Sequence, residues 1–283
     1  MSLPIPPASI CEPALGPAQI IAADGSTTWL TRGRTFVVAV SKVQSGCVLS
    51  RSDNLDEYML FLSEGMKTEV QAGTEQLDLD GSGDVLVIVP PGASEIRSRS
   101  EGWVTRIFSH RAKDLAAAAG NAEQQPVAAS DAPPAAPPGG FRLRHYPLAQ
   151  FIKPDSPARP FRSTNLMVNA FVPRNFRRDV RKMTPHAHAD FDQASLALQG
   201  TFTHHIRYPW TADMTTWRDD EHHAVGSPSV IVIPAQSVHT TQDTGVGFAQ
   251  LVDIFSPPRP DFVEKPGWVC NEADYPLAEG VPT

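Results

Sequence analysis

Prolines and glycines interrupt this chain at short intervals, and this limits its possible folds more than any other feature. The 27 prolines and 19 glycines are spread between apolar runs that are too short for long helices. Several of these runs are rich in β-branched and aromatic residues and are bounded by Gly, Pro, Asp or Ser, a pattern typical of strands. The sequence therefore predicts an all-β protein.

Strands are expected in both halves of the chain, on either side of a segment rich in alanine and proline. The expected strands span residues 35–41, 58–63, 75–80, 84–89, 165–172, 194–199, 201–208, 229–233 and 248–255. Residues 115–140 can begin as a short helix, but 133–140 (PPAAPPGG) must be a loop or an extended linker. The domain boundary is expected in this segment.

An internal repeat relates the two halves. Residues 50–65 and 185–200 have equal length, an acidic residue at the eighth position and a matching apolar rhythm before the final glycine. Further on, residues 84–95 match residues 229–239. A repeat of this kind indicates that one structural unit is used twice. The chain is therefore expected to contain one barrel fold in two copies.

The repeat and the linker together predict the domain organisation. We expect an N-terminal barrel over residues 1–113, an Ala/Pro-rich linker over 114–140 and a C-terminal barrel over 141–283. The last part includes a tail in which Trp268 and Tyr275 are expected to pack on a barrel and cover its edge.

Four side chains of the second half predict a metal site. His186 and His188 stand two residues apart, so an extended segment would point both to one face. Gln193 opens the next apolar run, and His239 follows a later one. Three imidazole nitrogens and one amide oxygen suit a divalent transition metal with positions left open for water or substrate. The donor set leaves Fe, Mn, Ni, Co and Zn as alternatives.

The matching positions of the first half are Arg51, Asp53, Tyr58 and Glu95. They include no imidazole, so we expect no comparable metal site there. The four could form a small polar cavity, but internal ion pairs or hydrogen bonds are the more common result of such replacements.

The repeated segments resemble the two motifs of the cupin superfamily, G-x5-HxH-x3-4-E-x6-G and G-x5-PxG-x2-H-x3-N. His186, His188 and Gly200 match the first motif, and Pro234 and His239 match the second. Both halves together resemble a bicupin over most of the chain. The resemblance implies two antiparallel jelly-roll barrels (double-stranded β-helices), of which the C-terminal one holds the metal. It implies no single reaction, because cupins include dioxygenases, isomerases, epimerases, lyases, decarboxylases and storage proteins.

The sequence departs from the residue types of the cupin motifs at three positions, and the departure at Gln193 has chemical weight. Gln193 stands where the family usually has Glu, Gln236 where it has Gly, and Gln242 where it has Asn. Because Gln193 is neutral, a bound metal would keep its full charge and be a stronger Lewis acid. A carboxamide also accepts no proton at neutral pH, so any base must be another residue, metal-bound hydroxide or the substrate.

The other histidines are expected in different surroundings. His204 has apolar residues two positions away on both sides, so it should point inward, either as a pocket residue that supports the ligands or as a packed core histidine. His205 should then point outward. His222 and His223 lie in the polar run RDDEHH and are expected in a solvated loop.

An aromatic insert at residues 208–217 lengthens the gap between the two motifs. It could cap a substrate pocket, or it could be a hairpin that packs on the other barrel. Arg207, just before it, could bind a substrate carboxylate, but we prefer a structural pair with Asp219 or Glu221.

Composition and charge exclude several kinds of partner. A formal charge of −7 without a basic stripe argues against nucleic acid, and no run approaches the ~18 apolar residues of a membrane span. Three widely spaced cysteines form no disulfide framework, which fits a reducing compartment. The first residues lack the features of a secretory signal. We expect a cytoplasmic protein with a small-molecule substrate, and a homodimer and a monomer both remain open.

These observations leave three functional hypotheses. The favoured one is a dioxygenase-like oxidoreductase at a mononuclear centre of three His and one Gln. The second is a metal-assisted isomerase or lyase that acts on a sugar or small carboxylate. The third is a non-catalytic cupin that binds a small molecule.

Overall fold

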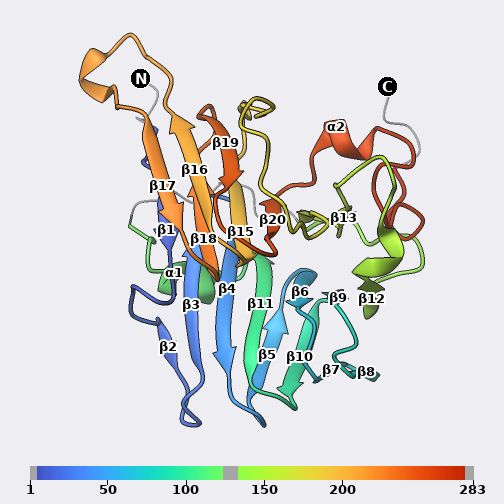
Figure 1. Ribbon diagram of the computed structural model, residues 1–283. Coiled ribbons are helices and arrows are strands. Elements are labelled where there is room, and N and C mark those ends of the chain that lie inside the picture. The colour runs from blue at the N-terminus through green and yellow to red at the C-terminus, as the bar shows by residue number, and fades with distance from the viewer. Residues whose placement is uncertain (1–4, 124–132, 278–283) are drawn as a thin grey trace.

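A computed structural model describes residues 5–123 and 133–277 of the chain (Figure 1). Over these residues, twenty strands form four sheets, and all the helices are short. The longest, α1, spans Lys113–Ala118, and none of the described helices is long and apolar enough to cross a membrane. The prediction of an all-β protein is therefore confirmed.

The four sheets form two barrels, as the repeat predicted. The N-terminal barrel has a seven-stranded sheet, in the order β12 (Arg144–Pro147), β9 (Val85–Val89), β6 (Tyr58–Leu62), β11 (Gly102–Ser109), β4 (Phe36–Val43), β3 (Thr27–Arg32) and β2 (Ile20–Ile21). Its second sheet has the order β5 (Val48–Asn54), β10 (Gly92–Ser98), β7 (Thr68–Ala72) and β8 (Glu75–Leu79).

The C-terminal barrel is built in the same way from a larger and a smaller sheet. Its six-stranded sheet has the order β1 (Ser9–Cys11), β18 (Ser229–Ile233), β15 (Gln193–Gln199), β20 (Gln250–Phe255), β14 (Met167–Ala170) and β13 (Pro160–Arg162). Its smaller sheet has the order β17 (Glu221–Val225), β16 (Phe202–Arg207) and β19 (Val238–Asp243). Each strand expected from the sequence coincides with one of these elements.

Each barrel takes one edge strand from the other half of the chain. Strand β1 pairs with β18, with Ser9 opposite Val232, and β12 pairs with β9, with Arg144 opposite Ile88. The pairing extends both larger sheets and ties the two barrels together. The exact domain boundaries at residues 113 and 140 remain a prediction.

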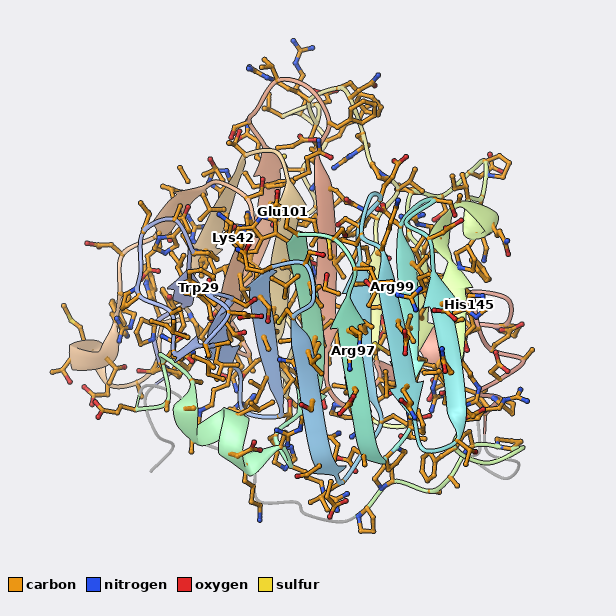
Figure 2. All side chains as sticks on the ribbon, turned by 90° about the horizontal axis from the view of Figure 1, so that it is seen from below. Trp29, Lys42, Arg97, Arg99, Glu101 and His145 are labelled. Atoms are coloured by element: carbon orange, nitrogen blue, oxygen red, sulfur yellow. The ribbon has the colours of Figure 1, made fainter. Side chains whose placement is uncertain are left out.

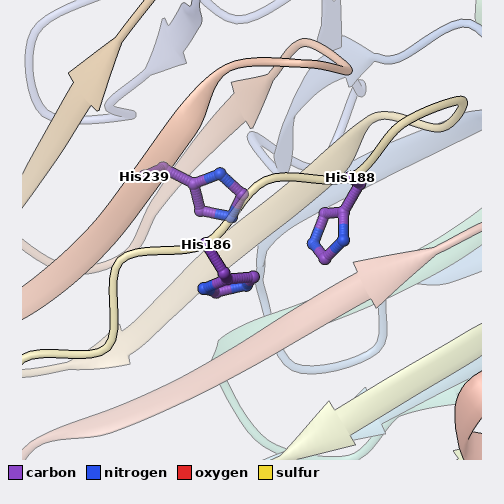
Figure 3. Close-up of side chains that lie close together, drawn as sticks. All are labelled: His186, His188 and His239. Carbon is purple, nitrogen blue, oxygen red and sulfur yellow. The ribbon is translucent and has the colours of Figure 1, made fainter.

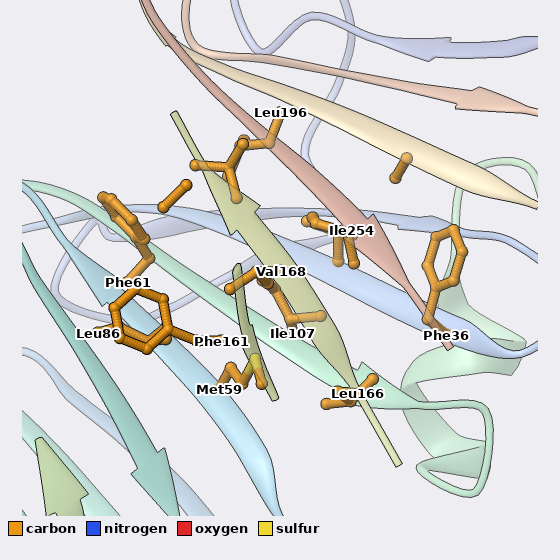
Figure 4. Packing of buried hydrophobic residues seen from close by; sticks show 14 of the residues in the cluster. Phe36, Met59, Phe61, Leu86, Ile107, Phe161, Leu166, Val168, Leu196 and Ile254 are labelled. Carbon is orange, nitrogen blue, oxygen red and sulfur yellow. The ribbon is translucent and has the colours of Figure 1, made fainter. Parts of the chain in front are cut away.

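The largest hydrophobic core lies between the barrels and not inside either of them. The two larger sheets pack against each other through buried residues such as Phe36 and Phe61 from one barrel and Leu196 and Ile254 from the other (Figure 4). Full burial of side chains of this size contributes about 1.5–3 kcal/mol each. A second large cluster fills the N-terminal barrel, whereas the apolar residues inside the C-terminal barrel form smaller clusters.

Glu57 and Asp192, the buried acidic residues at the repeated eighth position, join the two barrels through hydrogen bonds. The Glu57 carboxylate accepts hydrogen bonds from the Thr164 backbone N (3.0 Å) and the Tyr275 hydroxyl (2.7 Å) of the other half. Asp192 in turn accepts hydrogen bonds from Arg34 through its backbone N (2.9 Å) and Nε (3.0 Å). The repeated acids thus serve the interface between the barrels, since each one binds the opposite half.

The chain's tail covers the edge of the six-stranded sheet, as expected. The Cys270 backbone N donates to the Pro160 carbonyl on β13 (2.7 Å), and the Asn271 side chain exchanges two hydrogen bonds with the backbone of Arg162. Tyr275 is buried, with 3 % of its surface exposed. These contacts satisfy the backbone groups of an edge strand that would otherwise be open to pairing.

The strand register confirms most of the repeat but corrects one position. Arg51 pairs with Ser94 on β10, as His186 pairs with His239, so Ser94 and not Glu95 corresponds to His239. Between the pairs Gly92–Asn54 and Ser94–Arg51, β10 advances by two residues and β5 by three, so a bulge on β5 shifts the register and brings Ser94 opposite Arg51. Glu95 therefore points outward, with about half of its side chain exposed.

Candidate metal centre

Three imidazoles from two distant segments of the sequence converge inside the C-terminal barrel (Figure 3). One ligand atom from each of His186, His188 and His239 lies within 4.8 Å of those of the other two. Their ring centroids are 4.5–5.3 Å apart. His188 and His239 are buried, and His186 is exposed on the open side. The juxtaposition expected from the sequence is therefore present.

The His186–His188 segment is held by isolated backbone hydrogen bonds and not by a regular strand. It lies in the connection between β14 and β15, where a single bridge joins His186 to His239 on β19 through two N–H···O bonds of 3.1 and 2.8 Å. The backbone N of Gln236 donates to the His188 carbonyl (2.6 Å). These bonds hold the loop alongside β19. The backbone of the loop, and not the expected alternation along a strand, therefore sets the directions of the His186 and His188 side chains.

Gln193 directs its amide oxygen towards the imidazoles because a chain of two hydrogen bonds, called the relay below, holds its NH2 group. Its Nε2 donates to the Ser195 hydroxyl (3.1 Å), which donates in turn to the Asp253 carboxylate (2.6 Å). The Gln193 Oε1 atom is thereby directed to the Nε2 atoms of His188 (2.9 Å) and His239 (3.3 Å). Such outer contacts orient metal ligands and tune their affinity.

The protonation pattern of the cluster fits a bound cation. The His239 Nδ1 atom is 2.9 Å from the Ser237 carbonyl, which can only accept, so Nδ1 carries the hydrogen. In the neutral ring the Nε2 lone pair then faces the Gln193 oxygen, which is also an acceptor. Two facing lone pairs repel each other unless a cation lies between them. His186 is arranged alike, with Nδ1 3.0 Å from the Thr184 carbonyl.

Burial keeps the two inner imidazoles neutral at physiological pH. Burial lowers the pKa of His188 to about 4, although its hydrogen bond to Gln193 opposes the shift. It also lowers the pKa of His239 to about 4, against the opposing contact with the Ser237 carbonyl. Neutral imidazoles are the form that binds a metal. The assignment of His186, His188, Gln193 and His239 as ligands remains a prediction that metal analysis tests.

A pocket of about 290 Å³ opens onto the cluster, lined by His186, Gln193 and His239 but not by His188. Its wall also contains Arg174 and, deeper, Asp253. Burial raises the pKa of Asp253 to about 6, although the donated hydrogen bond from Ser195 opposes the shift. The volume suits a small organic molecule.

The two arginines of the pocket differ in their freedom to bind a ligand. Arg178 donates to the Thr241 carbonyl (3.0 Å) and to the Thr184 hydroxyl (2.8 Å), so its guanidinium is committed to the wall. The Arg174 side chain is 31 % exposed, and its guanidinium makes a longer ion pair with Asp243, of 3.5 Å, and lies 6.0 Å from the centroid of the Phe176 ring. Arg174 is therefore the better candidate to meet an anionic group.

No protein-family model matches this sequence, and no curated protein matches it. Solved structures do share its fold. An 11S allergen from Cocos nucifera is 10 % identical, with a TM-score of 0.58 over 92 % of this chain and 91 % of the other. The protein YlbA from E. coli is 12 % identical, with a TM-score of 0.57 over 89 % and 91 %.

An oxalate decarboxylase from Lactobacillus farciminis, in complex with formate, is 12 % identical, with a TM-score of 0.51 over 92 % of this chain and 87 % of the other. These neighbours are cupin-fold proteins, and the similarity spans both halves of the chain. The fold is that of a bicupin. At such low identity the likeness establishes the fold of this chain and no reaction.

Gln236 of this bicupin occupies the position that is usually Gly in the second motif, and the backbone shows why Gly is favoured. Its φ is 68°, in the left-handed region where a Cβ is disfavoured. The side chain is exposed, so it gains little from packing. The strain is accepted because the turn places the Gln236 backbone N on the His188 carbonyl.

Replacing Gln236 with glycine is expected to stabilise the bicupin by about 1 kcal/mol, because glycine removes the left-handed strain. Thermal unfolding of the metal-free protein measures the effect. The same change at Gln242, which lies in a strand, should instead destabilise the protein. An unfolding midpoint for Gln236→Gly below that of the natural protein would contradict the strain argument.

The structure places the remaining histidines only partly as expected. His204 is inward-facing and buried, but it does not line the pocket; its Nδ1 bonds the hydroxyl of Thr241, which does. It therefore supports the pocket wall. His222 and His223 are not in a loop, since both lie in strand β17, where cross-strand pairing with β16 places His222 beside His205. Their Nδ1 atoms are 2.7 Å apart.

Arg207 is paired structurally, as preferred, but with a different acid. Its guanidinium contacts Asp220, and neither Asp219 nor Glu221 takes that role. The difference arises because β17 begins at Glu221 and sets the adjacent Asp220 opposite Arg207. In the aromatic insert, Trp210 and Trp217 stack on each other with ring centroids 4.7 Å apart.

Acid is expected to destabilise the bicupin partly through His204. Burial, with the nearby His223, lowers the pKa of His204 from 6.5 to about 3. Below pH 6.5 the unfolded chain therefore binds a proton at His204 that the folded protein does not bind. The free energy of unfolding is highest above pH 6.5 and falls as the pH drops from 6.5 towards 3. In urea unfolding across this window, His204→Asn should lose less stability than the natural protein. Parallel curves would contradict the assignment.

Two residues of the site, Ser195 and Asp253, were not predicted from the sequence. Asp253 is the single acid in the apolar strand β20, and Ser195 is a small polar residue in β15. An acid within a buried strand is a signal in itself, because such a charge is costly unless it is bonded. Its partner could not be found, since Ser195 and Asp253 are 58 residues apart and meet only through strand pairing.

Proposed function

We propose that this bicupin is a metal-dependent enzyme that acts on a small organic substrate at one centre in the C-terminal barrel. The proposal is carried by the convergence of the imidazole lone pairs and the Gln193 oxygen beside an accessible pocket. A site that served only the fold would have no need of an opening beside its donors. The exposed position of His186 gives the substrate a way to the centre.

A divalent metal held by His186, His188, Gln193 and His239 would supply Lewis acidity or, with a redox-active metal, chemistry with O2. The chain's own residues would do the rest. Arg174 would pair with a carboxylate of the substrate at the pocket wall. Asp253 is mainly ionised at pH 7 and would accept a proton at its carboxylate, the role that Gln193 cannot fill.

Dioxygenase-like chemistry on such a substrate is the reaction that we propose first. The neutral donor set supports it, because three imidazoles and one amide leave coordination positions for both an organic ligand and O2. A metal-assisted isomerase or lyase is the second candidate. It is favoured by one specific observation, the proton acceptor Asp253 beside the pocket, which oxygen chemistry does not require.

Oxygen consumption separates the two candidates. Protein purified without oxygen and loaded with Fe(II) would be screened with phenolic, diketone and sugar-acid compounds in an oxygen electrode. Uptake that depends on one compound supports the first candidate, and turnover without oxygen supports the second. The matched variant is His186→Ala, in which either activity should disappear. Binding of a compound without turnover under both conditions would contradict an enzymatic role.

A further inference from the structure

The N-terminal barrel contains a buried arginine, Arg106, whose charge has no acidic partner. Only 5 % of its surface is exposed. Within residues 5–123 and 133–277, no hydrogen bond or ion pair ends on its guanidinium, and its Nε is buried without a partner. Its one close charge contact is the Phe108 ring, 5.5 Å from the guanidinium carbon to the centroid. An arginine keeps its proton at neutral pH, so this charge persists.

The strand register points Arg106 into the barrel. On β11 it lies opposite Ala39 of β4 and Leu60 of β6, and both of these side chains belong to the cluster that fills the interior. A second guanidinium, that of Arg51, lies 5.6 Å from the same Phe108 ring. Two cations thus share one aromatic ring inside a largely apolar barrel.

One acid near this pair cannot balance both charges. Asp114 of helix α1 binds Arg51 through two hydrogen bonds of 2.5 and 3.0 Å, and its side chain is 61 % exposed. The groups that act on the charge of Arg106 are Tyr58, Arg51 and Cys47, none of which is a carboxylate. A buried ion without compensation costs several kcal/mol, so a counter-ion is required.

At matching inward positions, the charged residues of the two barrels have opposite signs. Arg106 lies opposite Leu60, two residues after Tyr58, as Asp253 lies opposite Ser195, two residues after Gln193. The inward acid of one barrel is therefore replaced by an inward base in the other.

The remaining positions change in the same direction. Where the C-terminal barrel has His186 and His239, the N-terminal barrel has Arg51 and Ser94. The Ser94 hydroxyl lies 3.0 Å from the Tyr58 hydroxyl, and Tyr58 stacks on the Phe108 ring that both guanidinium groups contact. Guanidinium and hydroxyl groups donate hydrogen bonds to anions, whereas imidazole nitrogens and amide oxygens are ligands of cations.

We propose that the N-terminal barrel is an anion site that holds a small carboxylate against Arg106, with Arg51 and the hydroxyl pair as further donors. The side chains around Arg106 form a buried apolar cluster, so formate, the smallest carboxylate, is the probe of the site. Helix α1 closes this end of the barrel, because its Leu115 and Ala116 pack into the same cluster. The site is separate from the metal centre and does not depend on it.

Thermal unfolding of the full-length, chelator-treated protein in sodium formate tests the proposal. The natural protein should gain on the order of 5 °C in its midpoint when formate exceeds its dissociation constant about a hundredfold. Arg106→Met should lose this gain and remain folded, since it replaces an unpaired buried charge by an apolar chain of similar length. If Arg106→Met does not fold, Tyr58→Phe, which removes one donor, should weaken formate binding several-fold.

Two control variants exclude other sources of the effect. Arg97→Met removes an exposed arginine from the outer face of β10 (Figure 2), and Arg174→Met removes the more exposed of the two arginines that line the C-terminal pocket. Both variants should show the full rise of the unfolding midpoint in sodium formate. The outcome of the test therefore does not depend on the proposed enzyme activity. Equal gains in Arg106→Met and the natural protein would overturn the proposal. An equal response to sodium chloride would overturn the assignment to a carboxylate.

Discussion

Replacing His239 with alanine is expected to remove almost all of the tightly bound metal from this protein. Among the predicted ligands, the fold positions His239 most strongly, because two backbone hydrogen bonds join it to His186 and the Ser237 carbonyl fixes its tautomer. Its loss leaves two imidazoles, and we expect the affinity to fall by more than about 100-fold. Elemental analysis after gel filtration should find about one metal ion per natural chain and far less in the variant.

The control for this experiment is another histidine of the same chain. His145 on β12 is exposed on the outer face of the N-terminal barrel (Figure 2), and His145→Ala should retain the full metal content. Chelation should also lower the unfolding midpoint of the natural protein and of His145→Ala, but not that of His239→Ala, because only the first two lose a stabilising ligand. Equal metal content in all three proteins would refute the metal centre.

Replacing Ser195 with alanine is expected to weaken metal binding by about 10–100-fold without removing any ligand. The Ser195 hydroxyl joins Gln193 to Asp253, and without it the amide is free to rotate its NH2 group towards His188 and His239. An NH2 group cannot bind a cation, so part of the population loses its fourth donor. Competition with a chromogenic chelator measures the affinity.

A second buried serine of the same sheet separates this effect from lost stability. Ser229 on β18 donates its hydroxyl to the Gly226 carbonyl (2.7 Å) at the far end of the strand from Ile233, the residue that pairs with Gln193. Ser229→Ala should therefore cost a similar amount of folding energy and leave metal affinity unchanged. If both serine variants bind the metal as tightly as the natural protein, the relay does not orient Gln193.

The sequence repeat predicts most, but not all, of the matching positions in the two barrels. The matches of Tyr58 with Gln193 and of Arg51 with His186 hold, because Tyr58 and Gln193 pair with corresponding residues of the next strand and Arg51 and His186 pair with the corresponding Ser94 and His239. The match of Glu95 with His239 fails by one residue, because the register between β5 and β10 shifts at a bulge that alignment does not detect. That shift decides which side chain faces the barrel interior.

The amino-acid sequence by itself determined the all-β class and the nine expected strands, because strand periodicity is a local property, and its resemblance to the cupin motifs indicated the four side chains of the candidate centre. Only the tertiary structure decided that β1 and β12 exchange between the barrels, that Asp253 meets Ser195, and that Arg106 has no acidic partner. These features depend on which distant strands become neighbours and on what surrounds a buried charge. Neither property is encoded in the spacing of residues along the chain.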